Sequence, residues 1–159
     1  MKDEITRLPP LQKSVTVPLP RDKAFTLFTN GMGKWWPGES HSLSARDGQT
    51  PQKLEVEPHV GGRIWETTHD GRRLPWARIT EWEPGQRFGF DWHVGQDEED
   101  ATQVLVVFSH SDLGTRVDLT HGGFDRTPAG TEASASYDSG WDLVLNGCFG
   151  KACRAFVAA

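Results

Sequence analysis

The sequence has few of the residues that form covalent cross-links or metal centres. It contains two cysteines in 159 residues, Cys148 and Cys153. Their spacing points them to different faces of a helix and matches no zinc or redox motif. The six histidines are also scattered, without the spacing of metal ligands. We therefore expect two free thiols, as in a reducing cytoplasm, with no metal and no cofactor.

Basic residues and long apolar runs are scarce as well. Lys and Arg number 17 against 22 Asp and Glu, which leaves a net charge of -5. Binding to nucleic acid needs a basic surface, so this charge argues against such a partner. No segment approaches the roughly 20 apolar residues of a membrane span, and the first residues lack the apolar core of a signal peptide. We expect a cytoplasmic monomer or homodimer without a membrane partner.

Two common kinds of catalytic motif are missing. The serines lie in expected loops or at a helix start, so none occupies the strand-turn-helix elbow of a nucleophilic hydrolase. The Gly61-Gly62 pair joins two expected strands, whereas a phosphate-binding loop leads from a strand into a helix. The sequence therefore does not favour nucleophilic catalysis or nucleotide binding.

Aromatic residues, in contrast, are abundant. The chain has seven Trp and eight Phe but a single Tyr. Each aromatic ring brings a large apolar area, so we expect an aromatic core or cavity. The length is that of one domain. We expect a flexible arm over residues 1–12 and a single domain over residues 13–159.

The longest helical pattern runs from Thr131 to Val157. Its apolar residues recur at steps of three, four and seven, as in an amphipathic helix, and are Tyr137, Gly140, Trp141, Val144, Leu145, Cys148, Ala152 and Phe156. Gly140 is unusual there because glycine costs about 1 kcal/mol against alanine inside a helix. It either leaves room for a ligand or serves as a packing notch.

The preceding segments read mostly as strands joined by short turns. The strongest hairpin signal is Asp70-Gly71. A helix is expected over 20–28, a further turn over 32–36 and a polar loop over 38–51. Strands are expected over 13–18, 53–56, 63–68, 75–82, 87–94, 102–110 and 115–122. This order predicts an α+β protein in which the terminal helix covers an antiparallel sheet.

An ordered set of motifs carries a family resemblance. They are Trp35-Trp36-Pro37, His41-Ser42, Gly61-Gly62-Arg63-Ile64-Trp65-Glu66, Asp70-Gly71, Trp76-Ala77-Arg78-Ile79, Trp82-Glu83-Pro84, Trp92, Thr102, Val104, Gly114-Thr115-Arg116-Val117, His121, Tyr137, Gly140, Trp141 and Leu145. With these residues, the chain resembles the helix-grip fold of the START-like (SRPBCC) superfamily. Within it, the chain is similar to the activator of heat-shock-protein-90 ATPase-like (AHSA-type) family.

The resemblance implies a six- to seven-stranded sheet wrapped around the C-terminal helix, with a cavity between them that takes small, often apolar molecules. Four tryptophans from separate elements would converge on such a cavity. The residues expected to bind the ligand are Trp36, Glu66, Trp76, Phe90, Trp92, Phe108, His121, Tyr137, Gly140 and Trp141. The alternative is that the aromatic rings simply fill the core. His41, in the polar loop, either gates the cavity or is merely exposed.

Two polar residues on expected inward faces are candidates for chemistry. His121 shares a strand face with Val117 and Leu119, so it either acts as an acid or base or is an inert structural histidine. Glu66 lies two residues after Ile64 on the same expected strand, so both side chains should point to the inner face. A buried carboxylate needs partners, and those expected are His121 or the Tyr137 hydroxyl.

Three functions follow from these alternatives. The first is binding of a small hydrophobic or aromatic molecule without catalysis. The second is a cyclase- or dehydratase-like enzyme that uses Glu66 and His121. The third, suggested by the family name, is a protein-interaction module associated with a chaperone.

Overall fold

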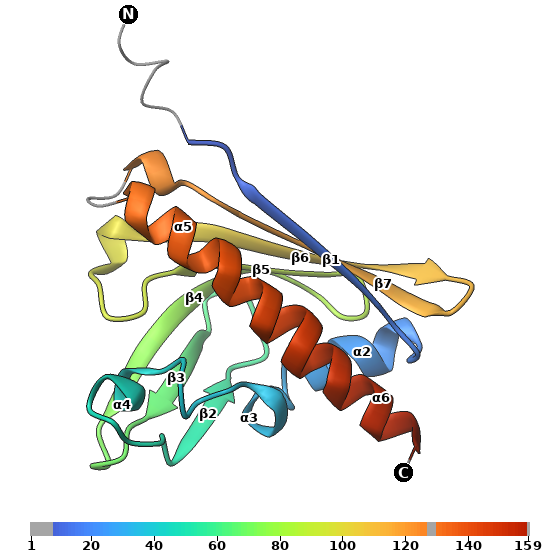
Figure 1. Cartoon of the computed structure of the whole chain (residues 1–159), viewed down its shortest axis with the longest axis horizontal. Coiled ribbons are helices and arrows are strands. Elements are labelled where there is room, and N and C mark those ends of the chain that lie inside the picture. Colours follow the sequence, from blue (N-terminus) through green and yellow to red (C-terminus); the bar gives the residue numbers. More distant parts are fainter. Residues whose placement is uncertain (1–7, 127–129, 159) are drawn as a thin grey trace, which may run out of the picture.

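A computed structural model describes residues 8–126 and 130–158. It shows one antiparallel sheet of seven strands with a long helix across its inner face (Figure 1). The strand order is β1-β7-β6-β5-β4-β3-β2, so the first strand pairs with the last and the others follow as a meander. The expected α+β helix-grip architecture is confirmed.

The strands lie close to the expected ranges. They are β1 (Leu11–Val17), β2 (Lys53–Val56), β3 (Arg63–Thr67), β4 (Arg73–Glu83), β5 (Arg87–Trp92), β6 (Thr102–Ser111) and β7 (Gly114–Gly122). β1 begins two residues earlier than expected, inside the segment assigned to a flexible arm, because Leu11 and Gln12 pair with His121 and Thr120 of β7. Irregular registers between β3 and β4 and between β4 and β5 bend this half of the sheet.

Short helices connect β1 to β2. They are α2 (Arg21–Phe28), α3 (Met32–Trp35) and α4 (Leu43–Arg46). The last of these lies in the stretch expected to be a polar loop. Ser42 caps it by accepting a hydrogen bond from the backbone N–H of Ala45. Two short 3-10 helices, η1 (Glu98–Asp100) and η2 (Phe124–Arg126), complete the connections.

The terminal helix has three parts that continue one another (Figure 1): α5 (Gly130–Trp141), the π-helix η3 (Asp142–Phe149) and α6 (Gly150–Ala158). The π segment was not expected. A π-helix bonds residue i to i+5, which adds a residue to the turn, as when the N–H of Gly150 donates to the carbonyl of Leu145. The buried stripe therefore proceeds in steps of four, through Trp141, Leu145, Phe149 and Cys153.

This shift corrects the expected stripe in its second half. Cys148 is only partly buried and Phe156 is 54% exposed, whereas Phe149 and Cys153 take the inward positions. An ideal α-helix of 3.6 residues per turn would have turned Cys148, Ala152 and Phe156 inward.

The inner face of the sheet is divided between two kinds of contact. At one end, Phe25 and Phe28 of α2 pack against Phe88 and Phe108 of the sheet with ring centroids 5.3–6.3 Å apart. At the other end, tryptophans of β4, β5 and the terminal helix meet Trp36. The phenylalanine end is solid core, and the tryptophan end contains the cavity.

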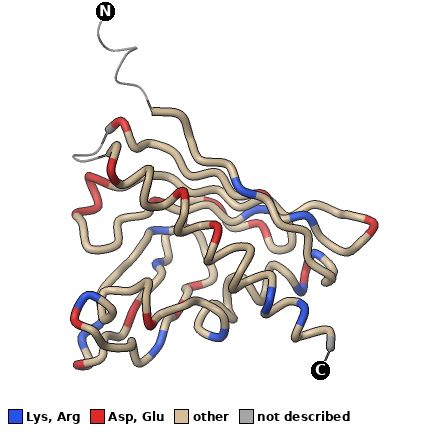
Figure 2. Tube along the Cα trace, in the orientation of Figure 1, with Lys and Arg blue, Asp and Glu red and all other residues tan. Residues whose placement is uncertain are grey.

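Charged residues tie the sheet to the helix at its edge. Lys13 of β1 forms ion pairs with Asp138 and Asp142 of the terminal helix, at 2.6 and 3.0 Å. The hydrogen bond to Asp138 is the largest cause that raises the pKa of Lys13. Elsewhere, Lys and Arg are interspersed with Asp and Glu along the chain (Figure 2). No helix of the described residues has the length and apolar character needed to cross a membrane.

Candidate functional site

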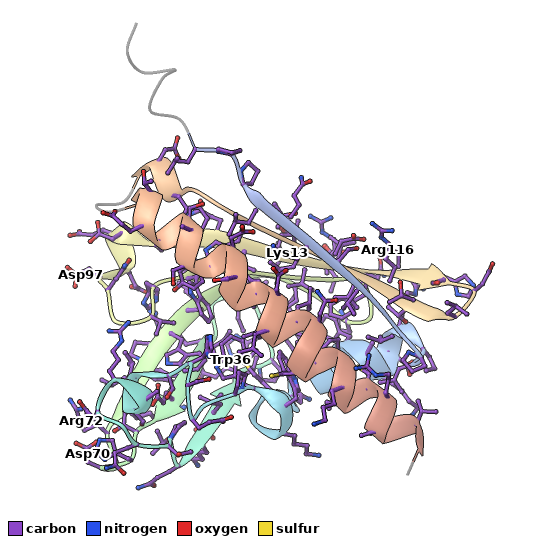
Figure 3. All side chains as sticks on the ribbon, in the orientation of Figure 1. Lys13, Trp36, Asp70, Arg72, Asp97 and Arg116 are labelled. Carbon is purple, nitrogen blue, oxygen red and sulfur yellow. The ribbon has the colours of Figure 1, made fainter. Side chains whose placement is uncertain are left out.

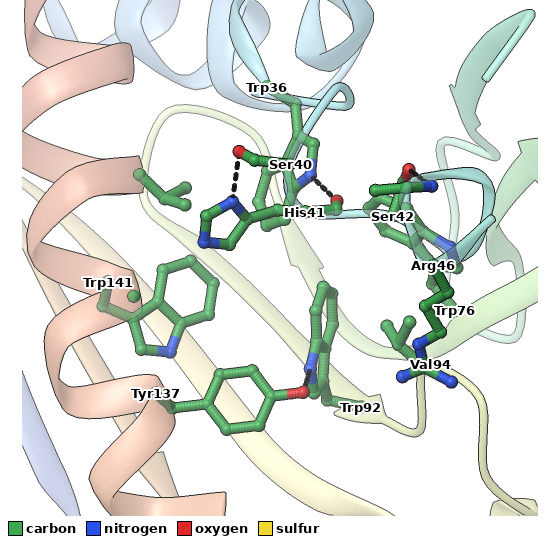
Figure 4. A pocket seen from close by; sticks show the side chains of 13 residues that line it. Trp36, Ser40, His41, Ser42, Arg46, Trp76, Trp92, Val94, Tyr137 and Trp141 are labelled. Atoms are coloured by element: carbon green, nitrogen blue, oxygen red, sulfur yellow. Dashed lines mark hydrogen bonds between the residues drawn. The ribbon is translucent and has the colours of Figure 1, made fainter. Parts of the chain in front are cut away.

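A cavity of about 400 Å³ lies between the terminal helix, the sheet and the segment 36–46. Thirteen residues line it: Trp36, Ser40, His41, Ser42, Ala45, Arg46, Trp76, Trp92, Val94, Tyr137, Gly140, Trp141 and Val144 (Figure 4). This volume is near the lower end of the roughly 300–1,000 Å³ typical of ligand pockets. It suits a compact molecule better than a long lipid chain.

Four tryptophans form the apolar walls. The ring of Trp36 lies 5.3 Å from Trp76, 5.9 Å from Trp92 and 6.0 Å from Trp141 between centroids. In the view with all side chains, Trp36 lies at the centre of the molecule, while the labelled charged residues Asp70, Arg72 and Asp97 lie at its edge (Figure 3). These tilted and edge-on contacts are the arrangements that aromatic pairs prefer.

Tyr137 of α5 places a hydroxyl in this aromatic wall. The indole N–H of Trp92 donates to the Tyr137 oxygen at 2.8 Å. Burial is the largest cause that acts on the phenol and raises its pKa, while the bond from Trp92 and the charge of Arg46 act in the opposite direction. The hydroxyl therefore keeps its proton at neutral pH and can donate it to an acceptor.

The segment that leads to α4 forms the wall opposite the helix. The indole N–H of Trp36 donates to the backbone carbonyl of His41 at 2.7 Å, and Nδ1 of His41 lies 2.7 Å from the hydroxyl of Ser40. Nε2 of His41 lies 3.9 Å from the position that a Cβ would take on Gly140. The absent side chain of Gly140 thus leaves space next to His41, and His41 lines the cavity.

Arg46, at the end of α4, brings a charge to the cavity. Its guanidinium lies over Gly95, where a Cβ atom would come within 2.2 Å of Nη1. Gly95 also has a φ of 71°, a conformation that favours glycine. A side chain at position 95 would therefore displace the Arg46 guanidinium from this place.

Glu66 has a structural position behind the cavity. It is fully buried, and its carboxylate accepts four hydrogen bonds of 2.6–2.9 Å. The donors are the backbone N–H groups of Leu43 and Ser44, the Ser44 hydroxyl and the Trp76 indole. Glu66 thus anchors α4 to β3, and the expectation that it pairs with His121 or Tyr137 is wrong.

His121 lies behind Trp141. The Trp141 indole N–H donates to Nδ1 at 2.9 Å, and Nε2 lies 2.6 Å from the hydroxyl of Thr102. Because an indole N–H can only donate, Nδ1 carries no proton and Nε2 donates to Thr102. Burial lowers the pKa of His121 to about 3. The ring is therefore neutral and both its nitrogens are bonded, so it orients Trp141.

This geometry separates the two candidates for acid and base. Glu66 is on β3 and His121 on β7, with β4, β5 and β6 between them. Neither lines the cavity. Their hydrogen bonds go to other residues and neither lines the cavity, so this geometry does not support a Glu66 and His121 catalytic pair.

The ten expected ligand-binding residues fall into two groups. Six line the cavity: Trp36, Trp76, Trp92, Tyr137, Gly140 and Trp141. Four do not, namely Glu66, His121, Phe90 and Phe108, which are buried in the core. Phe108 instead contacts α2, and Phe90 packs between Phe88 and Trp92.

Sequence reasoning missed most of the polar lining. The stretch assigned to a polar loop contains Ser40, Ser42, Ala45 and Arg46, of which only Ser42 was named, as part of a family motif. Val144 was expected in the apolar stripe of the terminal helix, and Val94 was not singled out. The capping serine before a short run that ends in Arg46 was the available signal for α4. Within the described ranges 8–126 and 130–158, no three His, Cys, Asp or Glu side chains come together in a way that could hold a metal ion.

Comparison with known proteins places the chain in a family. No curated protein matches it. A solved anthrahydroquino-gamma-pyrone synthase, Txn09, is 30% identical, with 84% of this chain and 89% of that chain covered and a TM-score of 0.59.

Two other solved structures share the fold. The AHSA1-like protein of Aeromonas hydrophila is 17% identical, with 94% and 95% covered and a TM-score of 0.65. The Aha1 dimer of Colwellia psychrerythraea is 15% identical, with 92% and 96% covered and a TM-score of 0.67.

The family comparison agrees with the motifs and the fold. The model of one family matches residues 18–147. This range includes every strand after β1, all of α5 and most of η3. The matched range also contains all thirteen residues of the cavity lining. The chain belongs to the family described as activator of Hsp90 ATPase homolog 1-like protein.

Proposed function

We propose that the protein binds a small aromatic molecule in the cavity between the terminal helix and the sheet. The observation that carries this proposal is the cavity of about 400 Å³ with four tryptophan walls. Each buried aromatic contact adds about 0.5–1.5 kcal/mol beyond the area it buries. A flat ring system would contact mainly Trp36, the least buried of the four, and the small accessible edges of Trp92 and Trp141.

The lining supports an aromatic ligand over a flexible chain. Trp76, Trp92 and Trp141 are each no more than 5% exposed, so they are held in place by the core before any ligand arrives. A pre-formed site avoids part of the ordering cost of binding. The 30% identical relative is an anthrahydroquino-gamma-pyrone synthase, which is consistent with a ligand of this class.

Ligand-dependent stabilisation tests the proposal. A molecule that binds only the folded state stabilises it by about 2.7 kcal/mol at a hundredfold excess over Kd. For a domain of this size, this corresponds to a rise in Tm of roughly 5–10 °C. A thermal-shift panel of two- and three-ring aromatic compounds, with fatty acids in parallel, should show such rises for the aromatic compounds.

Two glycine variants test whether the rise in Tm comes from binding in the cavity. Gly140→Leu places a side chain into open space beside His41, so it should fill the cavity and remove the shift. Gly147→Leu is the matched control, because Gly147 is on the same helix but exposed and its Cβ would contact only Leu143. A panel without any rise in the unsubstituted protein, or an equal rise in Gly140→Leu, would overturn the proposal.

A second candidate function is catalysis on the bound molecule. It is favoured by the synthase among the relatives and by His41, whose Nε2 faces the lining next to Gly140. An imidazole in such a place can transfer protons near neutral pH. Turnover of an aromatic polyketone that is lost in His41→Gln, while ligand-induced stabilisation is kept, would support it. Equal turnover in the variant would exclude His41 as the acid or base.

A further inference from the structure

The charges at the cavity are of one sign. Among its thirteen lining residues there is no Asp or Glu, and the only permanently charged side chain is Arg46. This differs from the chain as a whole, which carries a net charge of -5. The lining of the cavity therefore carries one permanent positive charge, on a protein whose net charge is negative.

Arg46 makes no ion pair or side-chain hydrogen bond within residues 8–126 and 130–158, whereas arginines such as Arg72, Arg87 and Arg116 are paired with carboxylates. Its guanidinium lies over Gly95, where a side chain would meet it. Arg46 is exposed, so the donors of its guanidinium are solvated and remain available where it lines the cavity. A guanidinium is suited to a carboxylate or another planar anion.

A second donor lies within the electrostatic range of Arg46. The hydroxyl of Tyr137 accepts from Trp92, and no described residue accepts the Tyr137 proton. Arg46 is close enough to act on the pKa of this phenol. In Figure 4, Tyr137 extends from the terminal helix toward Trp92, and Arg46 lies beyond Trp92, beside Val94. A ligand oxygen at this end could accept from Tyr137 and pair with Arg46.

The buried carboxylate of Glu66 does not offset the preference of the cavity for an anion. Glu66 contacts Trp76, which separates it from the cavity, and its two oxygens are already occupied by four donors. Its charge is therefore balanced by hydrogen bonds on the far side of the tryptophan wall.

Resting on the proposed function, we infer that the aromatic ligand is an anion, with a carboxylate or phenolate oxygen bound by Arg46 and Tyr137. The ring system lies among the tryptophans, and the charged oxygen lies at the end next to α4. Cationic aromatic molecules of the same shape are discriminated against by the Arg46 charge.

Three probes with one ring system test this inference: 2-naphthoate, neutral 2-naphthamide and the 2-naphthylmethylammonium cation. Calorimetric titration at pH 7.5 and low salt should give the order naphthoate, naphthamide, ammonium, with about tenfold or more between the first and the last. Arg46→Gln should weaken naphthoate about tenfold and change naphthamide by less than about twofold. Arg116→Gln is the control with the same change of charge, because Arg116 is exposed on β7 and paired with Asp118 (Figure 3).

Tyr137→Phe should weaken naphthoate and naphthamide together, because both offer an oxygen acceptor. The ammonium probe offers no oxygen acceptor, so the affinities of naphthoate and naphthamide relative to that probe separate this effect from any general loss caused by the unpaired Trp92 indole. Equal affinity for all three probes, or an equal effect of Arg46→Gln and Arg116→Gln, would overturn the inference and leave the proposed function standing. Binding of no probe, together with no response in the aromatic panel, would overturn both.

Discussion

The neutral His121 makes the stability of this protein sensitive to mild acid. Its pKa lies near 3 in the folded protein and near 6.5 for an ordinary histidine. Between these values the unfolded chain binds the proton and the folded chain does not. Stability is therefore fully present above pH 6.5 and is lost as the pH falls toward 3, by up to about 1.36 kcal/mol per pH unit. From pH 8 to pH 5 the loss should be about 2 kcal/mol.

Urea unfolding at pH 8 and pH 5 measures this loss, with His121→Gln as the reference. Glutamine keeps a donor and an acceptor but does not titrate, so the variant should lose about 2 kcal/mol less than the unsubstituted protein. His93, whose pKa burial also lowers, contributes equally to both proteins and cancels in the difference. The same loss in both proteins would refute the reasoning.

An NMR titration of the unsubstituted protein gives an independent measure that does not require the variant to fold. The His121 ring signals should stay unchanged between pH 8 and pH 5, and their nitrogen shifts should show the proton on Nε2, opposite the bond from Trp141. A ring that titrates near pH 6.5 would be incompatible with the buried, neutral histidine described here.

Three further predictions concern stability and reactivity. Glu66→Gln should cost about 1–3 kcal/mol in urea melts, because an amide group would face N–H donors that now meet carboxylate oxygens; an unchanged midpoint would contradict the anchoring role. Gly140→Ala should raise stability by up to about 1 kcal/mol, since its Cβ meets nothing closer than 3.9 Å, whereas Gly31→Ala should lower it, because its Cβ would come 2.9 Å from a carbonyl oxygen. Cys153, with a pKa raised by burial to about 12, should resist thiol reagents in the native protein while Cys148 reacts slowly, and rapid labelling of Cys153 would show that the helix opens.

Strand positions and their inward faces could be predicted from the sequence because a strand alternates its side chains strictly. The alternation of side chains places Phe108 and Trp92 on the same face of the sheet. It does not show which other element packs over each part of that face. The position of α2 over Phe108 and of the tryptophans over the other end depends on packing between distant segments. For this reason the expected ligand-binding set combined residues of the cavity with residues of the solid core.

The polar residues were harder to predict than the aromatic ones. A buried Glu66 signals a need for partners, yet nothing local to it indicates that Leu43 and Ser44 will provide them from α4. The π-helix η3 could not be predicted either. Its residues fit the α-helical pattern as far as Leu145, and the only departure is that Phe149 and Cys153 are buried in place of Cys148 and Phe156. Such features are set by contacts between elements, and the pattern of one segment does not contain them.

The pairing of β1 with β7 has a consequence for the order of folding during synthesis. Ser14 of β1 bonds Asp118 of β7, 104 residues later in the chain. At about 5–20 residues per second, a ribosome needs roughly 5–20 s to make this intervening stretch. Through this interval both edges of β1 are unpaired, because β7 is its only neighbour in the sheet, while β2 to β6 can already form their meander. A nascent chain whose residues up to 113 have emerged from the ribosome should therefore protect the amides of β4 and β5 from hydrogen exchange but leave those of β1 open.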